Sequence, residues 1–274
     1  MKESFFDRAI VVEAKVLSVG VKALVVKCEI TKVYCGSKAL VGTTFSDYNS
    51  KRRGPVPLLV VGETGIWTLV KNKNEIIPAS DDSFGGGINR IRKSMEVLHV
   101  DYNQYVQLAE EIGSIYHMEP KQRIHKVRED VNSDIPTIAY WAASVFPRFF
   151  DGKNVVRVMW DVRKTPLKTV AATLVVSKFL NDWDPEAWNP SKERLEDLQH
   201  CVQLKMTNDE GYTLLRDLES EITGGDWVDQ KTAVQLLESA RDNPSMDDWL
   251  KERFSDLLKE YLAKSQGGEK AKKR

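Results

Sequence analysis

Apolar and polar residues alternate along the first eighty positions of the chain. The segments Ala9–Val19 and Leu24–Tyr34 are rich in valine, and apolar residues alternate with polar ones along most of their length. A period of two is typical of half-buried β-strands. The short segment Val19–Lys22 between them predicts a turn, and therefore a hairpin. Further strands are expected at Thr43–Tyr48, Ile66–Val70 and Glu75–Pro78.

Three consecutive glycines, Gly85 to Gly87, mark a change in this pattern. Such a run disfavours regular structure, because glycine loses the most backbone freedom on folding. After it, apolar residues recur every three or four positions, which indicates amphipathic helices joined by short turns. Helices are expected at Gln104–Met118, from Pro120 onward, and at Thr137–Phe150, Val155–Val162, Leu167–Leu180, Ser191–Met206, Asp209–Ile222, Val228–Arg241 and Met246–Lys264.

Two of these helices follow a proline and share a short pattern. Pro136 precedes Trp141–Val145, and Pro166 precedes Val170–Leu174; both segments read apolar, Ala, Ala, hydroxyl, apolar. Paired alanines allow neighbouring helices to approach closely, so the echo favours a stacked array. Thr165 is expected to be the N-cap of the second helix.

Three segments of the β part occur in a recognisable order: Asp7–Val16, Val26–Gly36 and Val61–Leu69, with a basic, proline-containing loop before the third. In this order they resemble the netrin-like module in its bacterial form. The resemblance implies a five-stranded barrel of the oligonucleotide/oligosaccharide-binding (OB) type. Inhibitory members of that family chelate the zinc of a protease through an N-terminal cysteine. Residue 1 is Met here, so this mechanism does not carry over.

The helical part is similar to HEAT-type repeats, and Val155–Leu180 carries the resemblance best. This segment contains an apolar helix, a turn and a proline-opened helix with paired alanines. Lys168 stands where such repeats usually have an arginine, and Val162–Lys164 replaces their usual Asp-containing turn. The resemblance implies a solenoid that binds proteins on its concave face.

Together these observations predict an α+β protein of two domains, which suits a length of 274 residues. The N-terminal domain is expected to be a five-stranded OB-like β-barrel, and the C-terminal domain an all-α helical repeat array. The expected boundaries are residues 1–82 for the barrel, 83–103 for a linker and leading helix, 104–265 for the repeats and 266–274 for a disordered basic tail.

Charge and hydropathy limit the partners and the cellular locations that the sequence predicts. Forty basic and forty acidic residues cancel, so no overall field attracts nucleic acid or membrane. No apolar run reaches the roughly 18 residues of a membrane span, and no signal peptide is recognised. We expect no membrane insertion. The location is cytoplasmic as the sequence is written, and extracytoplasmic if an upstream signal was removed.

Catalytic and metal chemistry find little support in the sequence. The four histidines lack the i, i+4 spacing of a helical zinc site, and no Gly-x-Ser-x-Gly motif occurs. We therefore expect no enzyme, no cofactor and no metal. A turn is expected between Cys28 and Cys35. The two cysteines are therefore either buried thiols or, in an exported protein, a disulfide.

Candidate partner-binding residues lie in two loops. The first contains Tyr48 with Lys51, Arg52 and Arg53. The second, rich in Asp, Asn and Pro, contains Trp183 and Trp188, which either fill the gap between repeats or anchor a partner.

The sequence favours a non-enzymatic interaction or scaffold protein that binds an unidentified protein partner through the barrel and the concave helical face. The oligomeric state stays open. The alternative is a single-stranded nucleic-acid binder, with the basic loop and stacking by Tyr48 or Trp67 on the barrel.

Overall fold

The computed structural model describes residues 9–20, 25–48, 59–72, 75–79, 91–92, 101–151, 153–224 and 228–272. The contacts divide the chain into two compact units. Unit 1 comprises residues 1–131 and 137–155, and unit 2 comprises residues 132–136 and 156–274. Most of the predicted linker, residues 83–103, lies outside the described residues, so the predicted boundaries stay a prediction.

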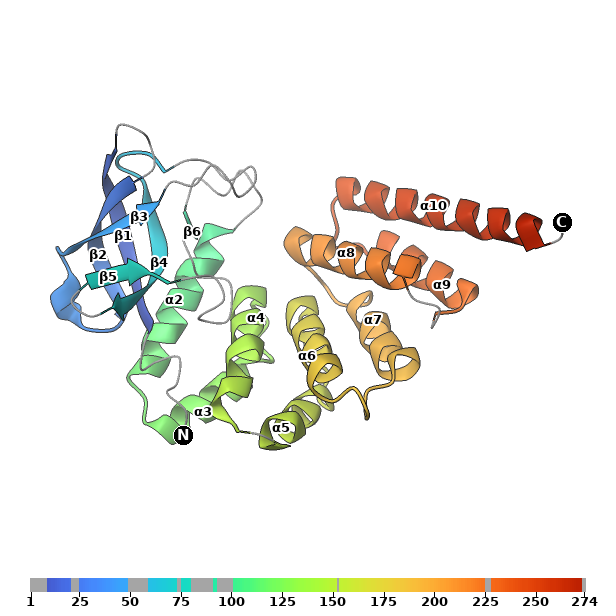
Figure 1. Cartoon of the computed structure of the whole chain (residues 1–274), viewed down its shortest axis with the longest axis horizontal. Coiled ribbons are helices and arrows are strands. Elements are labelled where there is room, and N and C mark those ends of the chain that lie inside the picture. Colours follow the sequence, from blue (N-terminus) through green and yellow to red (C-terminus); the bar gives the residue numbers. More distant parts are fainter. Residues whose placement is uncertain are drawn as a thin grey trace. The chain divides into compact units, whose positions relative to one another are not determined.

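The strands of unit 1 form a nearly closed antiparallel barrel (Figure 1). The sheet order is β3-β2-β1-β4-β5, with a short sixth strand paired to β4, and β3 comes close to β5 at the other end of the sheet. This confirms the predicted five-stranded, OB-like barrel. The strands are β1 (Ala9–Val19), β2 (Val25–Cys35), β3 (Thr44–Tyr48), β4 (Thr64–Asn72), β5 (Glu75–Pro78) and β6 (Ile91–Arg92), with a 3₁₀ turn η1 (Lys38–Leu40) before β3.

The barrel interior is filled by alternate side chains of its strands. Trp67 is fully buried and packs edge to face on Phe45, with ring centroids 5.9 Å apart. The indole Nε1 of Trp67 donates a hydrogen bond to Asp47 Oδ2 at 3.0 Å, so its polar atom is satisfied inside the core. Register shifts between β1 and β2 are irregularities of the kind that bend a sheet into a barrel.

Helix α2 (Tyr102–Tyr116) packs on β1, β2 and β4. Ile66 alternates with the inward-facing Trp67 along β4 and is nevertheless fully buried. A Cβ atom at Gly113 would lie 2.6 Å from the carbonyl oxygen of Tyr34, so only glycine allows this close approach. Part of the barrel's outer surface is therefore occupied by the chain itself.

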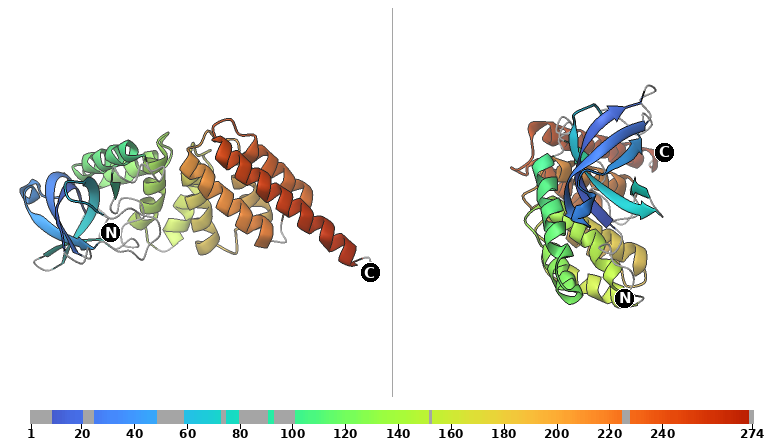
Figure 2. Two further views of the ribbon diagram at one scale, coloured as in Figure 1. Left: turned by 90° about the horizontal axis from the view of Figure 1, so that it is seen from above. Right: turned by 90° about the vertical axis from the view of Figure 1, so that its left-hand side faces the viewer.

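The described part of the chain contains nine α-helices, in agreement with the predicted helical region. In unit 2, α8 and α9 both lie against α10 (Figure 2), and α6 contacts α7 and α8. After α2, the helical elements are α3 (Pro120–Asp130), α4 (Pro136–Val145), the 3₁₀ turn η3 (Phe146–Phe149), α5 (Lys153–Arg163), α6 (Val170–Trp183), the π-helical turn η4 (Pro190–Arg194), α7 (Leu195–Cys201), α8 (Asn208–Gly224), α9 (Gln230–Arg241) and α10 (Asp248–Lys272).

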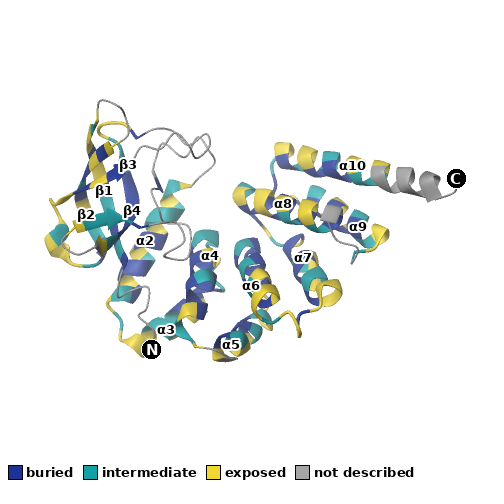
Figure 3. Ribbon diagram, viewed as in Figure 1, coloured by how far each residue is buried: buried dark blue, intermediate teal, exposed yellow. Residues whose placement is uncertain are grey.

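Each helix of unit 2 has a buried face (Figure 3), and the buried residues of α6 to α10 form a shared apolar core. Leu214, Leu218, Leu237, Leu250 and Phe254 are fully buried within it. The stripes have the helical period that the sequence showed.

Helix α6 begins later than its proline suggested. The expected N-cap was Thr165, whereas the observed N-cap is Thr169, whose hydroxyl accepts a hydrogen bond from the Ala172 amide at 3.3 Å. Two tertiary contacts hold the preceding residues outside the helix. The Leu167 carbonyl oxygen lies 2.6 Å from His200 Nε2, and the Lys168 amide donates to Asn132 Oδ1 at 3.1 Å.

Of the two alternatives for Cys28 and Cys35, the structure shows buried thiols and excludes the disulfide. Both residues lie on the single strand β2 with no turn between them; both are buried, and neither is in a disulfide. Seven residues of extended chain span about 23 Å, whereas a disulfide needs Cα atoms about 5.5 Å apart. Burial also raises the pKa of the Cys35 thiol to about 12, so the thiolate is disfavoured.

Candidate binding surfaces of the helical unit

The two loop tryptophans predicted from the sequence have different surroundings. Trp188 is 5 % exposed, and its ring centroid lies 5.9 Å from that of Trp160 on α5. The guanidinium of Arg163 lies 5.6 Å from the Trp160 ring centroid and 5.4 Å from that of Trp188. This geometry favours the interpretation in which Trp188 fills a gap within the helical array.

Trp183 is the last residue of α6 rather than a loop residue, and its side chain is 62 % exposed. Its ring stacks on Phe179, one helical turn earlier, with centroids 5.2 Å apart and planes inclined by 10°. Trp183 is therefore accessible to a partner, and its role in binding stays a prediction.

The candidate residues at the barrel cannot be placed in a site. Tyr48 ends β3 opposite Val25, but its side chain and the residues Lys51, Arg52 and Arg53 lie outside the described part of the chain. Trp67 is enclosed in the core and bonded to Asp47, so it cannot stack on a nucleotide base. The nucleic-acid alternative therefore loses one of its two stacking residues.

Two arginines form ion pairs inside unit 2. Arg194 binds Asp217 Oδ2 at 2.6 Å, Glu221 Oε1 at 3.0 Å and the Ser177 hydroxyl at 3.0 Å. Its side chain is only 11 % exposed. These bonds join the start of α7 to α6 and α8, so the network holds three helices in register.

The second arginine, Arg163, makes a similar set of contacts. It binds Asp197 Oδ1 and Glu196 Oε2, both at 3.1 Å, and the Glu193 carbonyl oxygen at 2.8 Å. Burial raises the pKa of the Asp197 carboxyl, and the neighbouring Arg163 opposes that rise. Asp197 is bound by an arginine, which accounts for its burial.

An exposed aromatic pair lies where α8 and α10 pack together. The rings of Tyr212 on α8 and Trp249 on α10 are stacked, with centroids 6.3 Å apart and planes inclined by 25°. Tyr212 is 48 % exposed and Trp249 is 53 % exposed. A Cβ atom at Gly211 would lie 2.9 Å from Leu250 Cδ1, so α8 and α10 approach closely at this position.

Two exposed arginines accompany the aromatic pair. Arg216 follows Tyr212 by four residues on α8, and Arg253 follows Trp249 by four residues on α10. Residues four apart share a helix face, so each arginine lies on the same face of its helix as one of the rings. Neither guanidinium forms an ion pair with another described residue. We call Tyr212, Arg216, Trp249 and Arg253 the aromatic–arginine seam.

Sequence reasoning did not identify this seam. The i, i+4 pairs of an aromatic residue and an arginine are visible in the sequence, but each lies on a different helix. Tyr212 and Trp249 are 37 positions apart, and only the packing of α8 on α10 brings their rings together.

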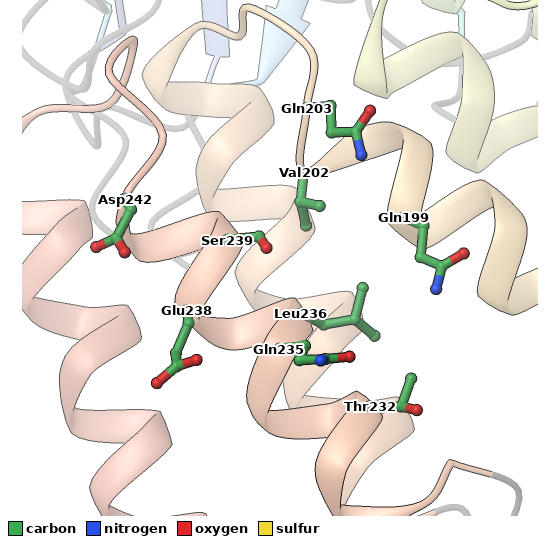
Figure 4. A pocket seen from close by; sticks show the side chains of 9 residues that line it. All are labelled: Gln199, Val202, Gln203, Thr232, Gln235, Leu236, Glu238, Ser239 and Asp242. Atoms are coloured by element: carbon green, nitrogen blue, oxygen red, sulfur yellow. The ribbon is translucent and has the colours of Figure 1, made fainter.

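A second surface feature is a groove between α7 and α9, with a volume of about 750 Å³ (Figure 4). We call it the α7–α9 groove. Buried Val202 and Leu236 contribute apolar atoms, and exposed polar side chains form the walls. The remaining lining residues are Gln199, Gln203, Thr232, Gln235, Glu238, Ser239 and Asp242.

Other chemistry has little support in the described residues. Among them, no group of three or more His, Cys, Asp or Glu side chains is arranged to hold a metal ion. Within the same ranges, no helix combines the length and apolar character needed to cross a bilayer. Comparison with protein-family models, with curated proteins and with solved structures finds no match to the chain.

Proposed function

We propose that this protein is a non-enzymatic interaction protein whose helical unit binds a protein partner through the aromatic–arginine seam. The observation that carries the proposal is the side-by-side exposure of Tyr212 and Trp249, each with an arginine four residues further along its helix. Tyrosine, tryptophan and arginine are the residue types that most often dominate the binding energy of protein interfaces.

The seam has the properties of a contact surface rather than of a core. Its rings stack on each other outside the buried cluster, so about half of each side chain stays in water. Burying the exposed parts against a partner would gain hydrophobic free energy. Arg216 and Arg253 would add hydrogen bonds to partner carboxylates or carbonyl groups.

The resemblances to a netrin-like barrel and to HEAT-type repeats support the same class of function. Helical arrays of the HEAT type bind proteins over extended surfaces. A resemblance of fold is a weak argument for function, so the proposal depends on the seam.

The test is affinity capture with the full chain as bait, with chemical cross-linking to locate the contact. The double variant Tyr212→Ala/Trp249→Ala should lower the recovery of the cross-linked partner at least tenfold, as expected for interface hot spots. Tyr140→Ala is the control, because it removes an exposed aromatic side chain of α4 that belongs to no proposed binding surface.

Two outcomes would overturn the proposal. One is a partner recovered equally by the wild type and the double variant. The other is the absence of any protein partner together with salt-sensitive binding of oligo-dT or oligo-U, which would favour the nucleic-acid alternative.

A further inference from the structure

The α7–α9 groove is separate from the aromatic–arginine seam and has a different chemistry. Its walls carry side-chain amides in place of aromatic rings: Gln199 and Gln203 on one side, and Gln235 on the other together with the hydroxyl of Ser239 (Figure 4). None of these four side chains makes a hydrogen bond with another residue that the structure describes. Their donors and acceptors are available to a ligand.

The spacing of these groups fits an extended peptide. Gln235 and Ser239 are four residues apart on α9, which corresponds to about 6 Å along a helix. Gln199 and Gln203 have the same separation in sequence on the opposite wall. An extended chain repeats every two residues, or about 6.7 Å, and offers one N–H and one C=O per residue. A glutamine amide supplies both a donor and an acceptor, so it can pair with either group.

The charge of the lining selects among peptides. Its charged residues are Glu238 and Asp242, and no lining residue is a lysine or arginine. Asp242 is held by Arg241 at 2.7 Å and 2.9 Å, whereas Glu238 forms no ion pair with another described residue. Glu238 lies on the other side of α9 from Leu236 (Figure 4), at the rim of the groove, where its exposed carboxylate can bind the charged group of a lysine or arginine.

From this geometry we infer that the α7–α9 groove is a second binding site, whose ligand is an extended peptide segment that carries a lysine or arginine side chain. The amides hold the peptide backbone, and Glu238 selects the basic side chain. The site adds to the proposed function and does not depend on it, because the two surfaces share no residue.

The experiment selects binders from a displayed library of random linear dodecapeptides, with the full chain as target. Enriched peptides should carry a basic residue at one fixed position. The best peptide is then labelled, and its affinity is measured by fluorescence anisotropy. Glu238→Gln/Asp242→Asn should weaken binding about fivefold, since each exposed charge contributes up to roughly 1 kcal/mol.

Two further variants separate the parts of the site. Gln203→Ala/Gln235→Ala should weaken binding about thirtyfold, since each of the two net hydrogen bonds is worth roughly 1 kcal/mol. This loss should persist in 0.5 M salt, whereas the effect of the charge variant should fade because salt screens exposed charges. Glu252→Gln/Glu260→Gln makes the same change of charge on exposed positions of α10, and it should bind like the wild type.

Several outcomes would overturn the inference. These are a library that yields no enriched peptide, enriched peptides without a basic position, and binding that is equal in the groove variants and the wild type. Binding lost in Trp249→Ala but retained in Glu238→Gln/Asp242→Asn would place the peptide on the seam, which overturns this inference and supports the proposed function.

Discussion

The barrel of unit 1 and the helices of unit 2 use buried polar groups differently. In the barrel, the indole of Trp67 bonds to Asp47 among apolar side chains. In unit 2, Arg194 and Arg163 are nearly buried and bind carboxylates of neighbouring helical elements. The first arrangement satisfies one polar atom of a core residue, and the second connects separate elements.

This difference follows from the hydrogen bonding of the backbone. Strands bond to their neighbours through the main chain, so the barrel register is fixed without charged side chains. A helix satisfies its own backbone groups, so only side chains can set how it lies against the next helix. Burial of apolar stripes holds helices together without fixing their relative orientation. The hydrogen-bonded arginine pairs have a defined geometry and therefore fix it.

The largest expected effect is in the barrel. Trp67→Ala should lower the free energy of unfolding by about 4 kcal/mol, because it empties the largest interior site and removes the bond to Asp47. Hydrogen exchange followed by mass spectrometry should show faster exchange in β1 and β4. Trp249→Ala, which removes an exposed indole, should change exchange little. Equal effects of the two variants would contradict the barrel packing.

The next effect is in the helical network. Arg194→Met should lower the free energy of unfolding by about 3 kcal/mol. The reason is that Asp217 and Glu221 would lose their ion-pair partner at a site mostly shielded from water. Exchange should accelerate in α6, α7 and α8. The matched control is Arg216→Met on α8, an exposed arginine without an ion pair among the described residues, which should change stability by about 0.5 kcal/mol or less. If both variants behave alike, the network does not hold the helices together.

A pH-dependent effect is expected at the α2–α3 contact of unit 1. Lys126 Nζ lies 2.7 Å from Asp130 Oδ1 and 2.6 Å from Glu111 Oε1. Burial raises the pKa of Asp130 to about 6 from its usual 3.8, and Lys126 opposes this rise. The folded state therefore binds the Asp130 proton more tightly than the unfolded state does. The protonated carboxyl stabilises the fold fully below pH 4, and this stabilisation is lost as the pH rises through 6.

The measurement is urea denaturation between pH 4 and 7, followed by circular dichroism. As the pH rises from 4 to 7, the free energy of unfolding of the wild type should fall by about 2 kcal/mol relative to that of Asp130→Asn. Glu129→Gln, at the exposed neighbouring position, should keep the pH dependence of the wild type. A wild type and an Asp130→Asn variant with parallel pH profiles would show that Asp130 does not titrate in this range.

The smallest effect is at a helix end. Asp229 caps α9, with its Oδ1 accepting a hydrogen bond from the Thr232 amide at 3.0 Å. Asp229→Ala should cost about 1 kcal/mol, as is typical of a lost N-cap. Exchange should increase in the first turn of α9 only. Asp248→Ala, an exposed acid in the first turn of α10, should have a smaller effect because no cap bond is lost.

The sequence predicted most of the secondary structure because its signals are local. Alternation over Ala9–Val19 identified β1 to the residue, and Glu75–Pro78 was also found with the observed bounds. The start of α6 was missed because His200 and Asn132, more than thirty residues away, hold Leu167 and Lys168 outside the helix. The turn expected between Cys28 and Cys35 is absent, because strand β2 continues through that position.

The sequence by itself determined the order of strands and helices, the change from one to the other, and the presence of exposed and buried faces. Only the tertiary structure decided that Trp188 is enclosed, that Tyr212 stacks on Trp249, and that Gln203 and Gln235 face one groove. The physical reason is the distance along the chain over which each feature is determined. Periodicity records which face of an element is apolar, whereas a binding surface depends on which distant elements pack together.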